Sequence, residues 1–323
     1  MTHDAKALAR ERLRGIWAAT LTPFRDDLSF DEEGWRANLR HWYGALGIRG
    51  LFVNGKQGEY YAMTLAERKR AAEIAVEEAR RYGGGVMVAC SDQNVDAVVE
   101  LARHAEAIGA EWVVVHTPVL YFGAHTEETL YEYYRHIAAQ VRIGVVLWNQ
   151  PPDCGYLLAP ELCLALAGIP NVVAIKYSVP RETYARLTRL AGERLIVSSS
   201  SEEEWLDNIV ELGWQVYLCS TPPFLLQTPA DRRMHEYTEL AFRGEVARAR
   251  AVSASLEPVR RALRTTRPAG KAAAHQKYWQ TLLGQVGGRV RRPLLELSEE
   301  EKAATRAAFE ACGLALGPAR AAA

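Results

Sequence analysis

The chain has 323 residues, of which 49% are hydrophobic and 24% charged, and its 39 basic residues balance its 39 acidic residues. This composition is typical of a soluble globular enzyme, and a net charge of zero gives no indication of a surface that binds nucleic acid. No apolar run is long enough for a transmembrane helix. The charged N-terminal segment lacks an apolar signal core, and the five cysteines form no C-x-x-C pair, so we expect a cytoplasmic protein with free thiols.

Short β-branched, apolar runs alternate with longer segments in which apolar residues recur at helical spacing. One such helical segment has Trp35, Leu39, Trp42 and Leu46 on one face. The runs predict eight strands, in chain order Gly15–Phe24, Gly50–Gly55, Gly85–Ser91, Trp112–Pro118, Ile143–Gln150, Val172–Ser178, Leu195–Ser200 and Val216–Thr221.

Several of the intervening helices have recognisable starts. Thr64 with Glu67 and Ser201 with Glu204 have the spacing of a capping box, in which two side chains satisfy the first free N–H groups of a helix. Pro160 suits the first position of a helix. These signals predict helices that begin directly after residues 64, 159 and 201.

Eight strand–helix units at roughly thirty-residue spacing predict a (β/α)8 barrel of the TIM type. A doubly wound sheet is the alternative, but no G-x-G-x-x-G or G-x-x-x-x-G-K-[ST] motif follows any strand. We expect residues 1–228 to form the barrel with an N-terminal segment. Residues 229–323 should contain the last barrel helix, a C-terminal helical extension and an Ala-rich tail after Gly313 that is disordered.

Lys176 lies inside an apolar strand, where an ammonium is costly unless it is paired, neutralised or used. Only seven of the 39 basic residues are lysine, so the chain uses arginine for most surface cations. Strand alternation places Lys176 on the same face as Val172 and Ala174. If this face lines the barrel, burial lowers the pKa of the amine and favours Schiff-base formation with a carbonyl compound. Pairing with a buried carboxylate, or snorkelling to the strand end, is the alternative.

A glycine-rich loop, "NGKQGE", follows the second strand. Gly55 and Gly58 can expose backbone N–H groups to a substrate carboxylate, and Gln57 can add side-chain hydrogen bonds. Lys56 can pair with an anionic group of the substrate or lower the pKa of Lys176 by repulsion. A glycine-rich turn with a solvated lysine is an equally good interpretation of this loop alone.

Taken together, the ordered motifs resemble the dihydrodipicolinate synthase / N-acetylneuraminate lyase family of class I, Schiff-base aldolases. The motifs are "TLTPF" (20–24), "GKQGE" (55–59), "LWNQP" (147–151) and "AIKYS" (174–178). The resemblance implies a barrel with C-terminal helices, a lysine Schiff base at Lys176, and a homo-oligomer, either a dimer or a tetramer. It also implies that Trp148 and Asn149 lie beside the substrate.

The chain departs from the family pattern where protons are moved. Lys56 and Gln57 occupy the positions of two hydroxylated residues that hold the carboxylate of pyruvate. Trp148 replaces a tyrosine that shuttles protons, and an indole N–H can only donate a hydrogen bond. Tyr121, at the end of the fourth strand, is the nearest replacement, and His125 is a weaker candidate.

The substrate also differs from that of the namesake enzymes. Asp153 follows the "WNQP" motif where dihydrodipicolinate synthases have an arginine, which argues against a role in lysine biosynthesis. Several strand ends are aromatic, which favours an apolar or aromatic substrate over a sugar acid: Tyr60, Tyr61, Tyr121, Phe122 and Trp148. Relatives that act as hydratase-aldolases on arylidene pyruvates suit such a pocket.

We therefore expect a carbon–carbon lyase that acts on a 2-oxo acid such as pyruvate. A Schiff-base dehydratase, or another imine-dependent enzyme of specialised metabolism, is a second hypothesis, and a non-catalytic sensor of small carbonyl compounds is a third. The sequence has no H-E-x-x-H motif and its histidines are scattered, so we expect no metal and no organic cofactor. The expected partners are a small-molecule carbonyl substrate and further copies of the chain, without nucleic acid or membrane.

Overall fold

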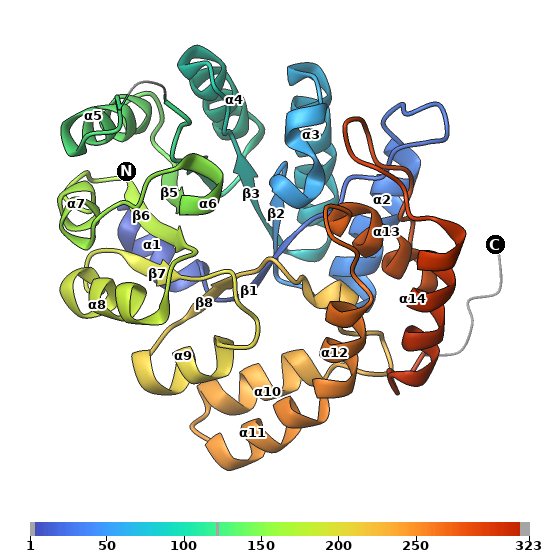
Figure 1. Ribbon diagram of the computed structural model, residues 1–323. Coiled ribbons are helices and arrows are strands. Elements are labelled where there is room, and N and C mark those ends of the chain that lie inside the picture. The colour runs from blue at the N-terminus through green and yellow to red at the C-terminus, as the bar shows by residue number, and fades with distance from the viewer. Residues whose placement is uncertain (1–3, 121–122, 317–323) are drawn as a thin grey trace.

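A computed structural model describes residues 4–120 and 123–316 of the chain (Figure 1). All eight predicted strands are present, and neighbours in the order β7-β6-β5-β4-β3-β2-β1-β8 pair in parallel. The side chain of Ser198 joins the two ends of this sheet, because its Oγ accepts a hydrogen bond from the N–H of Leu218 at 2.9 Å. The strands are β1 Gly15–Ala19, β2 Gly50–Val53, β3 Gly85–Ala89, β4 Trp112–His116, β5 Gly144–Asn149, β6 Val172–Tyr177, β7 Ile196–Ser198 and β8 Val216–Leu218.

Helices surround the barrel, as the alternating pattern predicts, and together with the strands they confirm the TIM-barrel fold (Figure 1). Up to the end of the strands they are α1 Ala5–Arg12, α2 Glu32–Arg40, α3 Leu65–Tyr82, α4 Val95–Ile108, α5 Glu127–Ala138, α6 Pro151–Cys154, α7 Pro160–Leu166, α8 Arg181–Ala191 and α9 Trp205–Leu212. The later helices are α10 Arg233–Phe242, α11 Val246–Ser255, α12 Glu257–Thr265, α13 Ala272–Leu282 and α14 Glu299–Ala311. Among the described helices, none is long and apolar enough to cross a membrane.

The barrel interior is filled by alternate residues of the strands, because successive side chains of a strand point to opposite faces. Ala9 and Leu13, from α1 and the residue after it, pack against this inner cluster. The strand residues of the cluster are Trp17, Ala19, Phe52, Met87, Ala89, Trp112, Val114, Val146, Trp148, Val173, Ala174, Ile196, Val216 and Leu218. Val173 is inside in place of Val172, because the register of β5 and β6 shifts between Val145 and Val146. The interior is therefore a packed core, and polar chemistry is confined to its ends.

The C-terminal helices pack against the outside of the barrel near α2. Asn38 donates a hydrogen bond to the carbonyl of Val286 at 2.8 Å, and the indole of Trp42 donates to Gln285 Oε1 at 2.8 Å. In Figure 1, α13 and α14, coloured orange-red to red, lie beside α2. The domain boundary after residue 228 stays a prediction. The expected disorder of the tail falls mostly on residues 317–323, outside the described residues.

Two of the three predicted helix starts are confirmed. Thr64 caps α3 with a complete capping box, and Pro160 is the first residue of α7. The box at Ser201 is wrong, because α9 begins only at Trp205 after Glu204. Instead, the neighbouring carboxylate of Glu202 is held by Arg260, so residues 202–204 form a turn.

Candidate active site

Lys176 lies near the carboxyl end of β6 and points into the barrel. In the sheet register it is level with Trp148 of β5 and Ser198 of β7. The side chain is buried, and its Nζ lies 5.0 Å from the ring centroid of Phe52 and 5.2 Å from that of Trp148. Nζ donates a long hydrogen bond of 3.5 Å to the carbonyl of Cys219. Among the described residues, no carboxylate forms an ion pair with Lys176.

Burial lowers the pKa of Lys176 from 10.5 to about 8, because the apolar surroundings disfavour the charged form. Lys56 lowers the pKa further by repulsion, whereas Asp153 raises it. About a tenth of the molecules then carry the neutral amine at pH 7. A neutral amine is the form that attacks a carbonyl carbon, so the lowered pKa favours Lys176 as a nucleophile.

The glycine-rich loop forms a 3-10 turn, Lys56–Gly58, directly after β2. Two residues in the left-handed conformation flank the turn, Asn54 and Glu59, each with φ of 58°. A Cβ on Gly58 would lie 3.0 Å from Thr22 Oγ1, so this position requires close backbone approach. The first N–H groups of such a turn have no partner within it and are free to meet a carboxylate.

The side chains of the loop are already engaged. Lys56 Nζ donates to both carboxylate oxygens of Asp153, at 2.9 and 2.7 Å, and Gln57 Nε2 donates to the carbonyl of Ser220 at 3.2 Å. The Lys56 side chain is 43% exposed. An anionic substrate group would therefore compete with Asp153 for the ammonium of Lys56.

A small cavity of about 80 Å³ opens at this end of the barrel. The loop after β2 supplies Lys56, and β5 supplies Trp148, whose indole Nε1 is buried without a hydrogen-bond partner among the described residues. The remaining lining residues are Tyr60, Tyr61, Ser91, Asp92, Gln93, His116, Thr117, Pro118, Val119 and Asp153. The cavity combines aromatic walls with charged groups, and Trp148 connects it to Lys176.

His116 belongs to this site, although its position in the sequence seemed unrelated to the other motifs. The residue ends β4 and is level with Trp148 in the register. Its ring meets the indole edge to face at a centroid distance of 4.5 Å. The alternation of Trp112, Val114 and His116 along β4 could have identified it, because the first two side chains lie in the barrel interior.

The side chain of Asn149, expected beside the substrate, has partners within the protein. Its side chain points away from the barrel interior, because it follows the inward Trp148. Its Nδ2 donates to Thr117 Oγ1 at 3.0 Å and to the carbonyl of Tyr156 at 2.9 Å, while Oδ1 accepts from the N–H of Leu158 at 3.2 Å. Asn149 therefore holds the segment after β5 in place, and its role beside a substrate stays a prediction.

The two expected replacements for the missing tyrosine have different outcomes. Tyr121, like Phe122, lies outside the described residues. His125 is committed to its own loop, because its Nε2 lies 2.8 Å from the carbonyl of Pro118 and its ring stacks on Tyr156. His125 therefore has a structural role in the described part of the chain.

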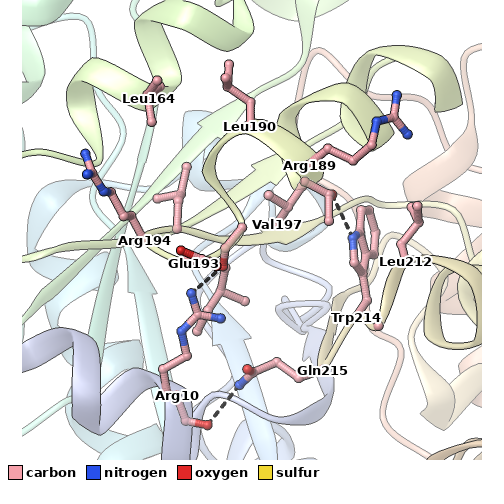
Figure 2. Close-up of a pocket in the computed structure, with 15 residues that line it drawn as sticks. Arg10, Leu164, Arg189, Leu190, Glu193, Arg194, Val197, Leu212, Trp214 and Gln215 are labelled. Atoms are coloured by element: carbon pink, nitrogen blue, oxygen red, sulfur yellow. Dashed lines mark hydrogen bonds between the residues drawn. The ribbon is translucent and has the colours of Figure 1, made fainter.

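A larger cavity of about 600 Å³ lies at the other end of the barrel (Figure 2). Gln215 donates a hydrogen bond to the carbonyl of Arg10 within it, and the indole of Trp214 donates to Thr188. The amino-terminal ends of β7 and β8 form its wall, whereas active sites of TIM barrels lie at the carboxyl ends of the strands. No group of three His, Cys, Asp or Glu side chains in residues 4–120 and 123–316 could hold a metal ion.

Comparison with known proteins identifies the family of the chain. The sequence model of the dihydrodipicolinate synthetase family matches residues 12–312. The 4-hydroxy-tetrahydrodipicolinate synthase of Methylobacterium radiotolerans is 30% identical over 305 residues, which cover 94% of this chain and 97% of that protein.

Two solved structures share the fold. The dihydrodipicolinate synthase of Thermotoga maritima is 26% identical, with a TM-score of 0.80, and the match covers 94% of this chain and all of that one. A prophage protein of Escherichia coli K12, solved in complex with pyruvate, has a TM-score of 0.82 at 24% identity, and the match covers 94% of this chain and 99% of that one.

Proposed function

Because the chain belongs to the dihydrodipicolinate synthetase family, whose members are aldolase-type lyases that use a lysine Schiff base, we propose that Lys176 is the lysine that forms it. The observation that carries the proposal is a buried amine at the end of β6 with a pKa lowered to about 8 and no carboxylate partner among the described residues. Nζ attacks the ketone carbon of a 2-oxo acid, and loss of water gives an iminium. The iminium accepts the electron pair of an adjacent C–C or C–H bond as that bond breaks.

The loop after β2 is proposed to hold the carboxylate of the substrate. The N–H groups at Lys56 and Gln57 begin the 3-10 turn, and the ammonium of Lys56 lies beside them. A carboxylate bound there forms charge-assisted hydrogen bonds in place of those that Asp153 makes now.

The remainder of the substrate is proposed to be apolar or aromatic. Tyr60 and Tyr61 line the cavity together with Trp148, and their rings can pack against an aryl group. This pocket supports cleavage or formation of an arylidene pyruvate, with addition or removal of water, better than chemistry on a polyhydroxylated sugar acid.

The test is reductive trapping. The protein is incubated with pyruvate, borohydride is added, and the modified residue is identified by mass spectrometry. We expect an adduct at Lys176 in the wild type and no adduct in Lys176→Ala, while Lys69→Ala, a change at a half-buried lysine of α3 that pairs with Glu100, leaves trapping intact. An adduct confined to another lysine would overturn the assignment.

Substrate class is tested separately. Purified protein is offered an arylidene pyruvate and a sugar-derived 2-oxo acid at equal concentration, and release of pyruvate is measured. Faster release from the aryl compound supports the proposed pocket. Faster release from the sugar acid contradicts the pocket and leaves the role of Lys176 intact.

A further inference from the structure

A basic nitrogen lies unused beside the nucleophile. Nε2 of His116 is buried and has no hydrogen-bond partner among the described residues. The ring lines the small cavity, and it meets Trp148 edge to face at 4.5 Å. A buried polar atom without a partner is costly, so its retention at the mouth of a catalytic barrel indicates a role with a bound molecule.

The tautomer of His116 follows from its other nitrogen. Nδ1 lies 2.7 Å from the carbonyl oxygen of Thr117, and a carbonyl oxygen can only accept, so Nδ1 carries the hydrogen. The backbone of Thr117 is fixed in turn, because its N–H donates to the carbonyl of Trp148 at 2.8 Å. In the neutral ring, Nε2 therefore presents a lone pair, which is the form of a general base.

The register of the strands places this base at the level of Lys176. His116, Trp148 and Lys176 occupy one level of three adjacent strands. Neighbouring strands lie about 4.8 Å apart, so the Cα atoms of His116 and Lys176 are about 10 Å apart. The indole of Trp148 lies between the two residues, 4.5 Å from the ring of His116 and 5.2 Å from Nζ of Lys176. We place the oxo acid of an imine at Nζ along this indole, with its far end in the cavity that His116 lines.

We infer that His116 is the general base and acid of this enzyme, the group that replaces the phenol absent at Trp148. The inference rests on the proposed Schiff base at Lys176. In the step, Nε2 takes a proton from C3 of the iminium. The electron pair of the C3–H bond becomes the C2–C3 double bond of an enamine, and the π pair of C2=N moves onto nitrogen. In the reverse direction the imidazolium returns a proton to C3.

Charged groups from three elements act on His116. Burial lowers its pKa, and Lys56 of the loop after β2 and Lys176 of β6 lower it further. The hydrogen bond to Thr117 and the carboxylate of Asp153 in α6 raise the pKa. The net shift is downward from 6.5, so the ring is neutral and basic at pH 7. Asp92 also lines the cavity and is held by Arg68 at 3.1 Å.

The test measures exchange of the methyl protons of pyruvate in D2O by NMR, alongside borohydride trapping. His116→Gln should retain trapping at Lys176 and lose at least about 100-fold in exchange rate per trapped imine, the usual contribution of a general base. His136→Gln, at an exposed histidine of α5, is the matched control and should exchange at the wild-type rate.

The outcomes separate this inference from the proposed function. Unchanged exchange in His116→Gln with trapping intact overturns the role of His116 alone, and so does a wild type that is trapped without exchange. Absence of trapping in the wild type overturns both. If His116→Gln does not fold, the pH dependence of the exchange rate in the wild type tests the role of His116. The exchange rate per trapped imine should fall as the pH drops through the pKa of His116, which lies below 6.5. An exchange rate that does not change with pH would overturn the inference.

Discussion

The ammonium of Lys277 lies 2.5 Å from Oε1 of Glu59, and both side chains are buried. Glu59 is the last residue of the glycine-rich loop, whereas Lys277 belongs to α13. The other carboxylate oxygen, Oε2, accepts a hydrogen bond from the N–H of Arg291 at 2.8 Å. The C-terminal helices thus reach the substrate loop through one buried ion pair, and they shape the site without lining it.

Breaking this pair should destabilise the protein strongly. Glu59→Gln leaves the ammonium of Lys277 buried without a counter-charge, and we expect a loss of about 3–5 kcal/mol in the free energy of unfolding. Denaturant unfolding measures the loss. Glu299→Gln, which breaks an exposed pair with Lys302, should cost less than about 1 kcal/mol. Equal losses in the two variants would show that the buried pair contributes no more to the free energy of unfolding than the exposed pair.

Lys56 and Asp153 provide a second prediction, on substrate affinity. Lys56→Met removes a charge-assisted contact to the substrate carboxylate, and we expect KM for a 2-oxo acid to rise about 10- to 100-fold. Asp153→Asn should lower KM, because it frees the ammonium of Lys56. Steady-state kinetics with Lys69→Met as the control measures both effects. A KM that Lys56→Met leaves unchanged would place the carboxylate elsewhere.

The buried ammonium of Lys176 should lower the free energy of unfolding at neutral pH. A pKa lowered from 10.5 to about 8 corresponds to about 3 kcal/mol of unfavourable burial of the ammonium. Below pH 8 both the folded and the unfolded chain bind the proton, so the full cost is present, and above 10.5 neither does. Lys176→Met should therefore unfold at higher denaturant concentration than the wild type at pH 7, with a difference that shrinks between pH 8 and 10.5. A Lys176→Met variant that is less stable than the wild type at pH 7 would contradict a stability cost of the buried ammonium.

Asn149 should matter for stability and not for substrate binding. Asn149→Ala leaves the N–H of Leu158 without its partner, at a cost of about 1–3 kcal/mol for a buried unpaired group, and removes one of the two donors to the carbonyl of Tyr156, which keeps the contact to Cys154 Sγ. We expect a lower melting temperature with an unchanged KM for the 2-oxo acid. A raised KM in Asn149→Ala without a loss of stability would indicate that Asn149 contacts the substrate.

The sequence predicts the barrel well because its strands are short β-branched runs, each bounded by turn residues. It fails at Ser201, where the spacing of a capping box is present but Glu202 is engaged by Arg260 and Tyr237, both far away in the sequence. The tertiary contacts of Glu202 therefore override the local capping-box spacing of Ser201 and Glu204. The pair of Glu59 and Lys277 is beyond sequence reasoning for the same reason.

Within the site, period-two alternation carries more information than the motifs alone. It places Lys176 inside the barrel, and the same rule separates Trp148, which lies inside, from Asn149, which does not. Applied to β4, it also selects His116. The engagement of Lys56 by Asp153 could not be predicted, because it depends on how two loops from different strands meet.

The indole of Trp148 has a practical consequence. Its ring lies 5.2 Å from the amine of Lys176, so the charge on that nitrogen acts directly on the excited state of the ring. Protonation of the amine, formation of the iminium and conversion to the neutral enamine each change this charge or its position. In the proposed mechanism, Trp148 is thus a fluorophore beside the nucleophile, and its emission is expected to change as the imine forms.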